Sequence, residues 1–160
     1  MGNWTNEDGL QVQYGTQDEH LTGTTKDGKF TMVVDWSFDD LPTFKADLNN
    51  NGTLNGFSGA DANIPQGAYI TDAYVVVTTA FAGGTTYNMG FYEEDGSVID
   101  VDGLDAAVAV ADMGAGEVVR CNGALAGGTL SMAENGYLVI AATGTYTAGV
   151  AKLYIEYVNP

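Results

Sequence analysis

The sequence has few of the residues on which most catalytic and metal-binding chemistry depends. Its 160 residues include one cysteine, one histidine and five lysines and arginines, against 21 aspartates and glutamates. A single cysteine, Cys121, excludes an internal disulfide. Together with the only histidine, His20, it cannot form a zinc site of the usual kinds or a supported thiol nucleophile. We therefore expect no cofactor and interpret Cys121 as a small buried thiol.

The shortage of basic residues leaves a formal net charge of −16. Nucleic acids and anionic membrane surfaces both require lysine and arginine from the protein, so we expect neither as a partner. No apolar run has the length of a membrane span, and the first residues lack the basic and apolar regions of a signal peptide. We expect a soluble chain that is made in a cytoplasm.

Strand patterns occupy most of the remaining sequence. The stretch Ile64–Tyr92 is the centre of this pattern, because no residue from Ala73 to Tyr92 is charged and β-branched and aromatic residues flank Gly83-Gly84. This pattern predicts two strands paired as a hairpin in the middle of the sheet core.

Further strands are predicted on both sides of this stretch. Residues Phe30–Phe38 alternate between apolar and polar, and Tyr137–Thr143 is a continuous apolar run. Glu117–Cys121 and Gly149–Val158 are further predicted strands, the latter with Leu153, Ile155 and Tyr157 on one face and Lys152, Tyr154 and Glu156 on the other. The alanine-rich segment 103–112 predicts one short helix, which Asp102 would cap.

The predicted fold is therefore all-β: a single β-sandwich or jelly-roll-like domain over residues 30–160. Residues 1–29 are polar and predict an extended N-terminal arm. Within it Leu10, Val12 and Tyr14 alternate with glutamines, and Trp4 has little apolar company nearby. We interpret these four residues as an anchor on a neighbouring protein. The alternative is that they fold back as an edge strand of their own domain.

An Asn/Gly/Asp-rich loop contains one weak metal candidate. Asp47, Asn49, Asn51 and Gly52 match the first ligand positions and the glycine of a calcium loop. The twelfth position is Ser58 rather than glutamate, and no helices flank the loop, so a plain turn is the main interpretation. Carboxylates elsewhere fall in acidic turns without an accompanying cleft pattern, and the sequence predicts no enzyme.

Four segments carry a resemblance to a known family. They are Asn6-Glu7-Asp8-Gly9-Leu10-x-Val12-x-Tyr14-Gly15-Thr16; Ile64-Pro65-x-Gly67-Ala68-x-Ile70 followed by Val75-Val76-Val77-Thr78-Thr79-Ala80; Asp102-Gly103-Leu104-Asp105-Ala106-Ala107-Val108-Ala109; and Asn135-Gly136-Tyr137 followed by Thr147-Ala148-Gly149-x-x-Lys152-x-x-Ile155-x-Tyr157. In this order they resemble small structural proteins of tailed bacteriophages of marine and freshwater bacteria, the cyanophage-like capsid decoration or cement proteins.

The resemblance implies a virion protein on the exterior of the capsid. Its partners would be the major capsid protein and further copies of itself, and the family offers no catalytic residues. The alternative is a head-fibre or tail-associated protein that binds a glycan through tyrosines. The candidates are Tyr69, Tyr74, Tyr87, Tyr92 and Tyr146, although alternation places several of them in the core.

Overall fold

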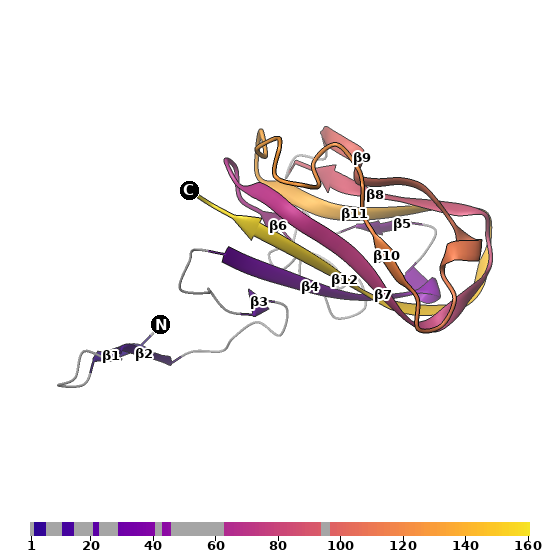
Figure 1. The fold of residues 1–160 in the computed structure, drawn as a ribbon, viewed down its shortest axis with the longest axis horizontal. Helices are drawn as coiled ribbons and strands as arrows, with labels where there is room; N and C mark the ends of the chain where they lie inside the picture. Colours follow the sequence, from indigo (N-terminus) through magenta and orange to yellow (C-terminus); the bar gives the residue numbers. More distant parts are fainter. Residues whose placement is uncertain are drawn as a thin grey trace.

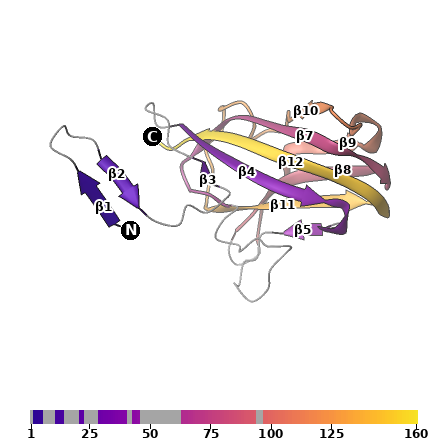
Figure 2. The ribbon, with the colours of Figure 1, turned by 90° about the horizontal axis from the view of Figure 1, so that it is seen from below.

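The protein is a sandwich of two antiparallel sheets, which Figures 1 and 2 show as stacked layers. The computed structural model describes residues 2–5, 11–14, 21–22, 29–40, 43–45, 63–93 and 97–160; for the strands at 2–5, 11–14, 21–22 and 43–45 only the backbone is described. The predicted all-β sandwich is thus confirmed. No helix in the described part of the chain is long and apolar enough to cross a membrane.

The two sheets are assembled from strands distant in sequence. The first sheet has the order β10 (Val118–Arg120), β7 (Tyr69–Gly83), β12 (Tyr146–Val158), β4 (Lys29–Ser37) and β3 (Leu21–Thr22). The second has the order β5 (Thr43–Lys45), β11 (Gly136–Thr143), β8 (Thr86–Tyr92) and β9 (Val98–Ala109), with β6 (Asn63–Ile64) also paired to β11. A 3₁₀ turn, η1 (Phe38–Asp40), ends β4, so Phe38 lies just beyond the strand in which the sequence places it.

Alternate residues of each strand fill the core between the sheets. Leu153, Ile155 and Tyr157 of β12 are buried as predicted, and Met32 and Val34 of β4 lie beside them. An aromatic cluster closes one end of the core, where the ring centroid of Trp36 is 4.7 Å from that of Phe81 and 5.5 Å from that of Tyr87. Burial of this apolar surface is the main source of stability.

The predicted central hairpin is wrong, because β7 and β8 lie in different sheets. β7 pairs with β12 and β8 pairs with β11. Gly83 and Gly84, with φ of 74° and 62°, turn the chain from the first sheet to the second. Gly144, with φ of 89°, makes the same crossing between β11 and β12. The pattern of apolar residues in a strand does not specify which other strand it pairs with; here both β7 and β8 pair with strands that are distant in the sequence.

The two crossings are joined to each other. The backbone N–H of Gly84 donates to the carbonyl of Thr145 at 2.7 Å, and that of Thr85 donates to the carbonyl of Thr143 at 2.8 Å. We call this pair of crossings the glycine corner. These hydrogen bonds satisfy backbone groups of residues at which the chain leaves one sheet for the other, and they hold the two crossings side by side.

The predicted helix at 103–112 is also wrong. β9 continues to Ala109, and only the 3₁₀ turn η2 (Val110–Asp112) follows, without a side-chain cap. The pairing with β8 is irregular here: Ala107 has φ of 52°, and its N–H donates to the side-chain oxygen of Asn88 at 2.7 Å. Alanine favours the helix over most residues by only about a few tenths of a kcal/mol per residue. Pairing with β8 outweighs a preference of this size.

The N-terminal region forms a hairpin of β1 (Gly2–Thr5) and β2 (Gln11–Tyr14). Its register places Trp4 opposite Val12 and Gly2 opposite Tyr14, so the three predicted anchor positions share one face of the two-stranded sheet. Leu10 lies outside the described residues. β3, within the predicted arm, pairs with β4, and the division into an arm (1–29) and a domain (30–160) remains a prediction.

The glycine corner generates a stability prediction. An added Cβ at Gly83 would collide with the backbone carbonyl of Thr145, whereas one at Gly116 meets nothing within 4 Å, although both glycines have positive φ. We expect Gly116→Ala to cost about 1–2 kcal/mol for the backbone conformation. Gly83→Ala should cost about 1–3 kcal/mol more for the overlap. Urea unfolding of the two variants measures the difference, and equal losses would contradict the role of the corner.

Candidate functional site on the outer face of the first sheet

The outer face of the first sheet carries an ordered set of aromatic, aliphatic and charged side chains. Since Leu153 and Ile155 point into the core, Lys152, Tyr154 and Glu156 of β12 lie on the opposite side. The strand register then places Tyr154 between Tyr74 of β7 and Val33 of β4. It places Lys152 between Val76 and Asp35 in the same way. We call this surface the outer face.

Two tyrosines stand together at the centre of the outer face. The rings of Tyr74 and Tyr154 are stacked, with centroids 5.1 Å apart and an interplanar angle of 10°. Partial burial, followed by the nearby carboxylate of Glu156, raises the pKa of Tyr74 above its ordinary value, so its hydroxyl stays neutral. The pair therefore offers a rigid apolar surface with hydrogen-bonding hydroxyls, a combination favoured in protein interfaces.

Ion pairs flank the tyrosines on both sides. Lys152 Nζ lies 2.9 Å from Asp35 Oδ1, and Arg120 Nη2 lies 3.2 Å from Asp72 Oδ2. The hydrogen bond that Lys152 donates to the Asp35 carboxylate, followed by the charge of that carboxylate, raises the pKa of Lys152. The Arg120 side chain is 74% exposed, and ion pairs in water add little to stability. These charges are therefore free to exchange their partners for those of a bound protein.

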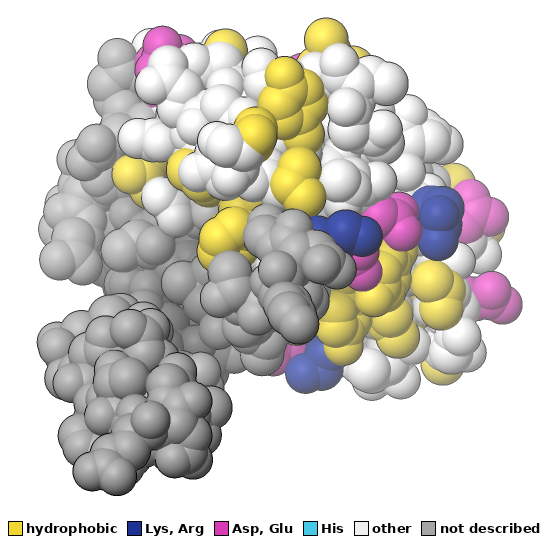
Figure 3. Space-filling view, turned by 60° about the vertical axis from the view of Figure 1, so that its left-hand side comes forward, with side chains coloured by type: hydrophobic (Ala, Val, Ile, Leu, Met, Phe, Trp, Pro, Cys, Tyr) yellow, Lys and Arg dark blue, Asp and Glu magenta, His cyan; other side chains and the backbone are white. Residues whose placement is uncertain are grey.

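The outer face has a charge balance different from that of the chain as a whole. Every lysine or arginine whose side chain the structure describes lies on it, namely Lys29, Arg120 and Lys152. Figure 3 shows lysine and arginine side chains interspersed with acidic ones beside hydrophobic side chains. Asp35, Asp72 and Glu156 balance them, so the face is neutral in a protein with a net charge of −16.

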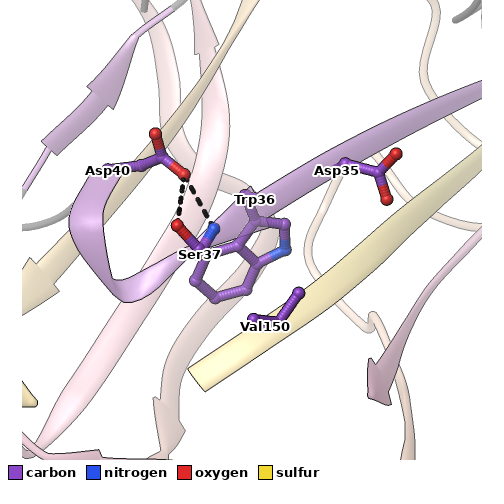
Figure 4. Close-up of a pocket in the computed structure, with 5 residues that line it drawn as sticks. All are labelled: Asp35, Trp36, Ser37, Asp40 and Val150. Carbon is purple, nitrogen blue, oxygen red and sulfur yellow. Dashed lines mark hydrogen bonds between the residues drawn. The ribbon is translucent and has the colours of Figure 1, made fainter. Parts of the chain in front are cut away.

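A small pocket opens at the end of the outer face, where β4 enters η1. Its volume is about 180 Å³, and Asp35, Trp36, Ser37, Asp40 and Val150 line it (Figure 4). Asp40 Oδ2 accepts hydrogen bonds from the backbone N–H of Ser37 at 2.7 Å and from its hydroxyl at 3.1 Å. A pocket of this size, lined by two carboxylates, can receive the end of one apolar or basic side chain but is too small for a whole cofactor.

The sequence reasoning identified the strand faces but missed the outer face as a site. Alternation separates Lys152, Tyr154 and Glu156 from the core. Their neighbours on β7, β4 and β10 depend on pairings between distant segments, which no local pattern shows. The calcium candidates Asp47, Asn49 and Asn51 lie outside the described residues. Among the described residues, no group of three or more histidine, cysteine, aspartate or glutamate side chains could hold a metal ion.

Two titratable side chains, Cys121 and Tyr87, are buried in the core between the sheets. Cys121 is 6% exposed, as predicted for a buried thiol, and burial raises its pKa to about 12. Burial also raises the pKa of Tyr87, whose hydroxyl donates to the sulfur of Met113 at 2.9 Å. Both groups are therefore protonated at neutral pH. A protonated, inaccessible thiol is a poor nucleophile.

The chain was compared with known proteins at three levels. No family model matches it, and no curated protein matches it. Among solved structures, a chain of the cyanophage Pam1 capsid asymmetric unit is 16% identical, with 98% of each chain covered and a TM-score of 0.48. A chain from the capsid of Ralstonia phage GP4 is 15% identical, with 92% of each chain covered and a TM-score of 0.47.

The burial of Cys121 predicts its reactivity. We expect a thiol reagent to label the folded protein at least about a hundredfold more slowly than the urea-unfolded protein at pH 8, because the thiol is both enclosed and protonated. An Ala124→Cys variant, with its new thiol at an exposed position of the following turn, is the control and should label rapidly at one site. Rapid labelling of wild-type Cys121 would contradict the assignment.

A second prediction concerns Asp105, which is 4% exposed and accepts a hydrogen bond from the N–H of Ala106 at 3.0 Å. Burial raises the pKa of Asp105, although hydrogen bonds from the Ala106 and Asn122 backbone lower it. The folded state therefore holds the proton more tightly than the unfolded state, and stability is lost as pH rises through the raised pKa. We expect Asp105→Asn to gain in Tm relative to wild type between pH 3 and pH 7.

Thermal unfolding at several pH values tests this expectation. Asp39→Asn, at an exposed position of η1, controls for the loss of one negative charge. A Tm difference between Asp105→Asn and wild type that is constant over this range, or that moves the other way, would contradict it.

Proposed function

We propose that this chain is a structural protein of a tailed-bacteriophage particle, and specifically a decoration or cement protein on the outside of the head. It binds the lattice of the major capsid protein, and copies of itself, at symmetric junctions. The four sequence segments that resemble the phage family support this proposal. Its action is mechanical: it bridges adjacent subunits so that pressure from packaged DNA does not open the seam.

The observation that carries the proposal is the neutral outer face on an otherwise acidic sandwich. Acidic surfaces repel copies from one another and from DNA, so contact is directed to the one face where charge is balanced. That face offers stacked tyrosines and an exposed arginine, residue types that are enriched among those supplying most of the binding energy at protein interfaces. A cement protein requires such a surface on a stiff domain and does not require an active site.

The N-terminal region completes the proposal. Trp4, Leu10, Val12 and Tyr14 would form the anchor that reaches from the domain across a seam. The shared face of Trp4, Val12 and Tyr14 in the β1–β2 hairpin supports a common contact surface for these residues.

A glycan-binding head-fibre or tail-associated protein is the second candidate. The structure favours it at one point, since Tyr74 and Tyr154 lie beside Asp72 and Glu156. Sugar rings stack on open aromatic faces, however, and these two tyrosines stack on each other. Tyr87 and Tyr146 of the predicted set are buried and cannot contact a glycan. The same tyrosine pair fits a protein partner better.

Co-sedimentation with phage heads that lack the protein tests the proposed function. We expect saturable binding at a fixed ratio to capsid subunits. Arg120→Glu and Tyr154→Ala should each weaken it by about tenfold or more, the loss typical of interface hot-spot residues. Val98→Ala removes an apolar residue that is 57% exposed on β9 of the second sheet, and should bind as wild type does.

A chain lacking residues 1–20 separates the two parts of the proposal. Loss of binding in this variant would support the N-terminal anchor, whereas full binding would leave the cement function and remove the anchor. Absence of binding by the wild-type protein would overturn the cement function. Binding to a glycan array, abolished by Tyr154→Ala, would then support the second candidate.

A further inference from the structure

We infer that the outer face receives the N-terminal β1–β2 hairpin of a neighbouring copy of the same chain. This inference names the partner of the outer face and rests on the proposed function, since a lattice holds copies side by side. It follows from three properties of the hairpin and the face: a two-stranded sheet without a further described strand partner, an outer face without the net negative charge of the chain, and the reach of the connecting chain.

The hairpin is a structure that needs a partner surface. Among the described strands, β1 and β2 pair only with each other, and Figures 1 and 2 both show them outside the sandwich. An isolated two-stranded sheet is at best marginally stable in water. One face of this sheet holds the positions of Trp4, Val12 and Tyr14, and covering that face would supply the missing stability.

The outer face repels an acidic segment less than the rest of this acidic chain does. Residues 1–22 contain four carboxylates, Glu7, Asp8, Asp18 and Glu19, and no lysine or arginine. The outer face holds all the basic side chains that the structure describes. An acidic segment that approaches other described surfaces meets mainly negative charge. At the outer face, Arg120 and Lys152 can form ion pairs with the incoming carboxylates in place of those with Asp72 and Asp35.

The apolar parts also fit. The stacked Tyr74 and Tyr154, with Val33 and Val76 beside them, form a strip across three strands. Aromatic side chains meeting aromatic side chains at a partly buried centre are typical of interface hot spots.

The connection limits how far the hairpin can lie from the edge of its own first sheet. β3 is fixed at the edge of the first sheet by its pairing with β4. Only residues 15–20 separate β2 from β3, which allows a span of at most about 25 Å. The hairpin thus stays beside the sheet edge, within reach of an adjacent copy across a seam. Because hairpin and face are different surfaces, the contact is head-to-tail, and it closes into a ring when the rotation between successive copies is a whole fraction of a turn.

Disulfide trapping with the full chain tests this inference, since the native thiol of Cys121 is buried and new thiols are the reactive ones. Val12→Cys places a thiol in the hairpin, and Val33→Cys places one beside Tyr154 on the outer face. The two single variants are mixed and oxidised, both as concentrated protein and on heads. We expect a covalent dimer in which mass spectrometry of peptides links position 12 of one chain to position 33 of another.

Controls make each outcome decisive. Val12→Cys mixed with Val98→Cys, on the second sheet, should give less than about a tenth of this link, the level of random collision at a site without steering. A link within one chain of the Val12→Cys/Val33→Cys double variant, without mixed dimers, would overturn the neighbour as partner. Absence of the 12–33 link in both settings would overturn the inference, while sedimentation of the same variants with heads reports separately on the cement function.

Discussion

The pairing of the two chain crossings at the glycine corner is the constraint on which the rest of the structure depends. Gly83 and Gly84 take β7 out of the first sheet just where Gly144 brings β12 into it, and backbone hydrogen bonds join the crossings. Two strands that enter and leave at one point can only run antiparallel and side by side. This fixes β7 next to β12, and therefore Tyr74 next to Tyr154. The candidate site is thus set by a turn at the far end of the strands.

This dependence explains how far sequence reasoning could go. The faces of β4, β11 and β12 follow from local alternation, because a buried side of a strand is visible in the strand itself. The partner of a strand is not. The uncharged stretch from Ala73 to Tyr92 is compatible both with two strands paired as a hairpin and with two strands that lie in different sheets. The outer face requires the register of four strands, so it could not be assembled before the fold was known.

The alanine-rich segment was predicted incorrectly for a related reason. Its helix preference is a local quantity of small size, and the free edge of β8 offers backbone partners that a helix on the surface would leave unused. The strand nonetheless remains irregular, with a positive φ at Ala107 and a buried Asp105. A sequence poorly suited to a strand is tolerated at the sheet edge, where register shifts cost least.

The neutral outer face allows one surface of the protein to bind closely while the rest of the surface, which is acidic, keeps free copies apart. A net charge of −16 keeps free copies apart, yet a lattice protein must hold other copies closely. Ion pairs such as Arg120–Asp72 contribute little to the folded domain but determine which surface can approach. In the contact that we propose, a two-stranded hairpin of marginal stability would spend part of the binding free energy on its own ordering, so each single contact would be weak and reversible. Repetition of the proposed contact on a lattice would make the sum of such contacts strong, because release of one contact leaves the others to hold the copy in place.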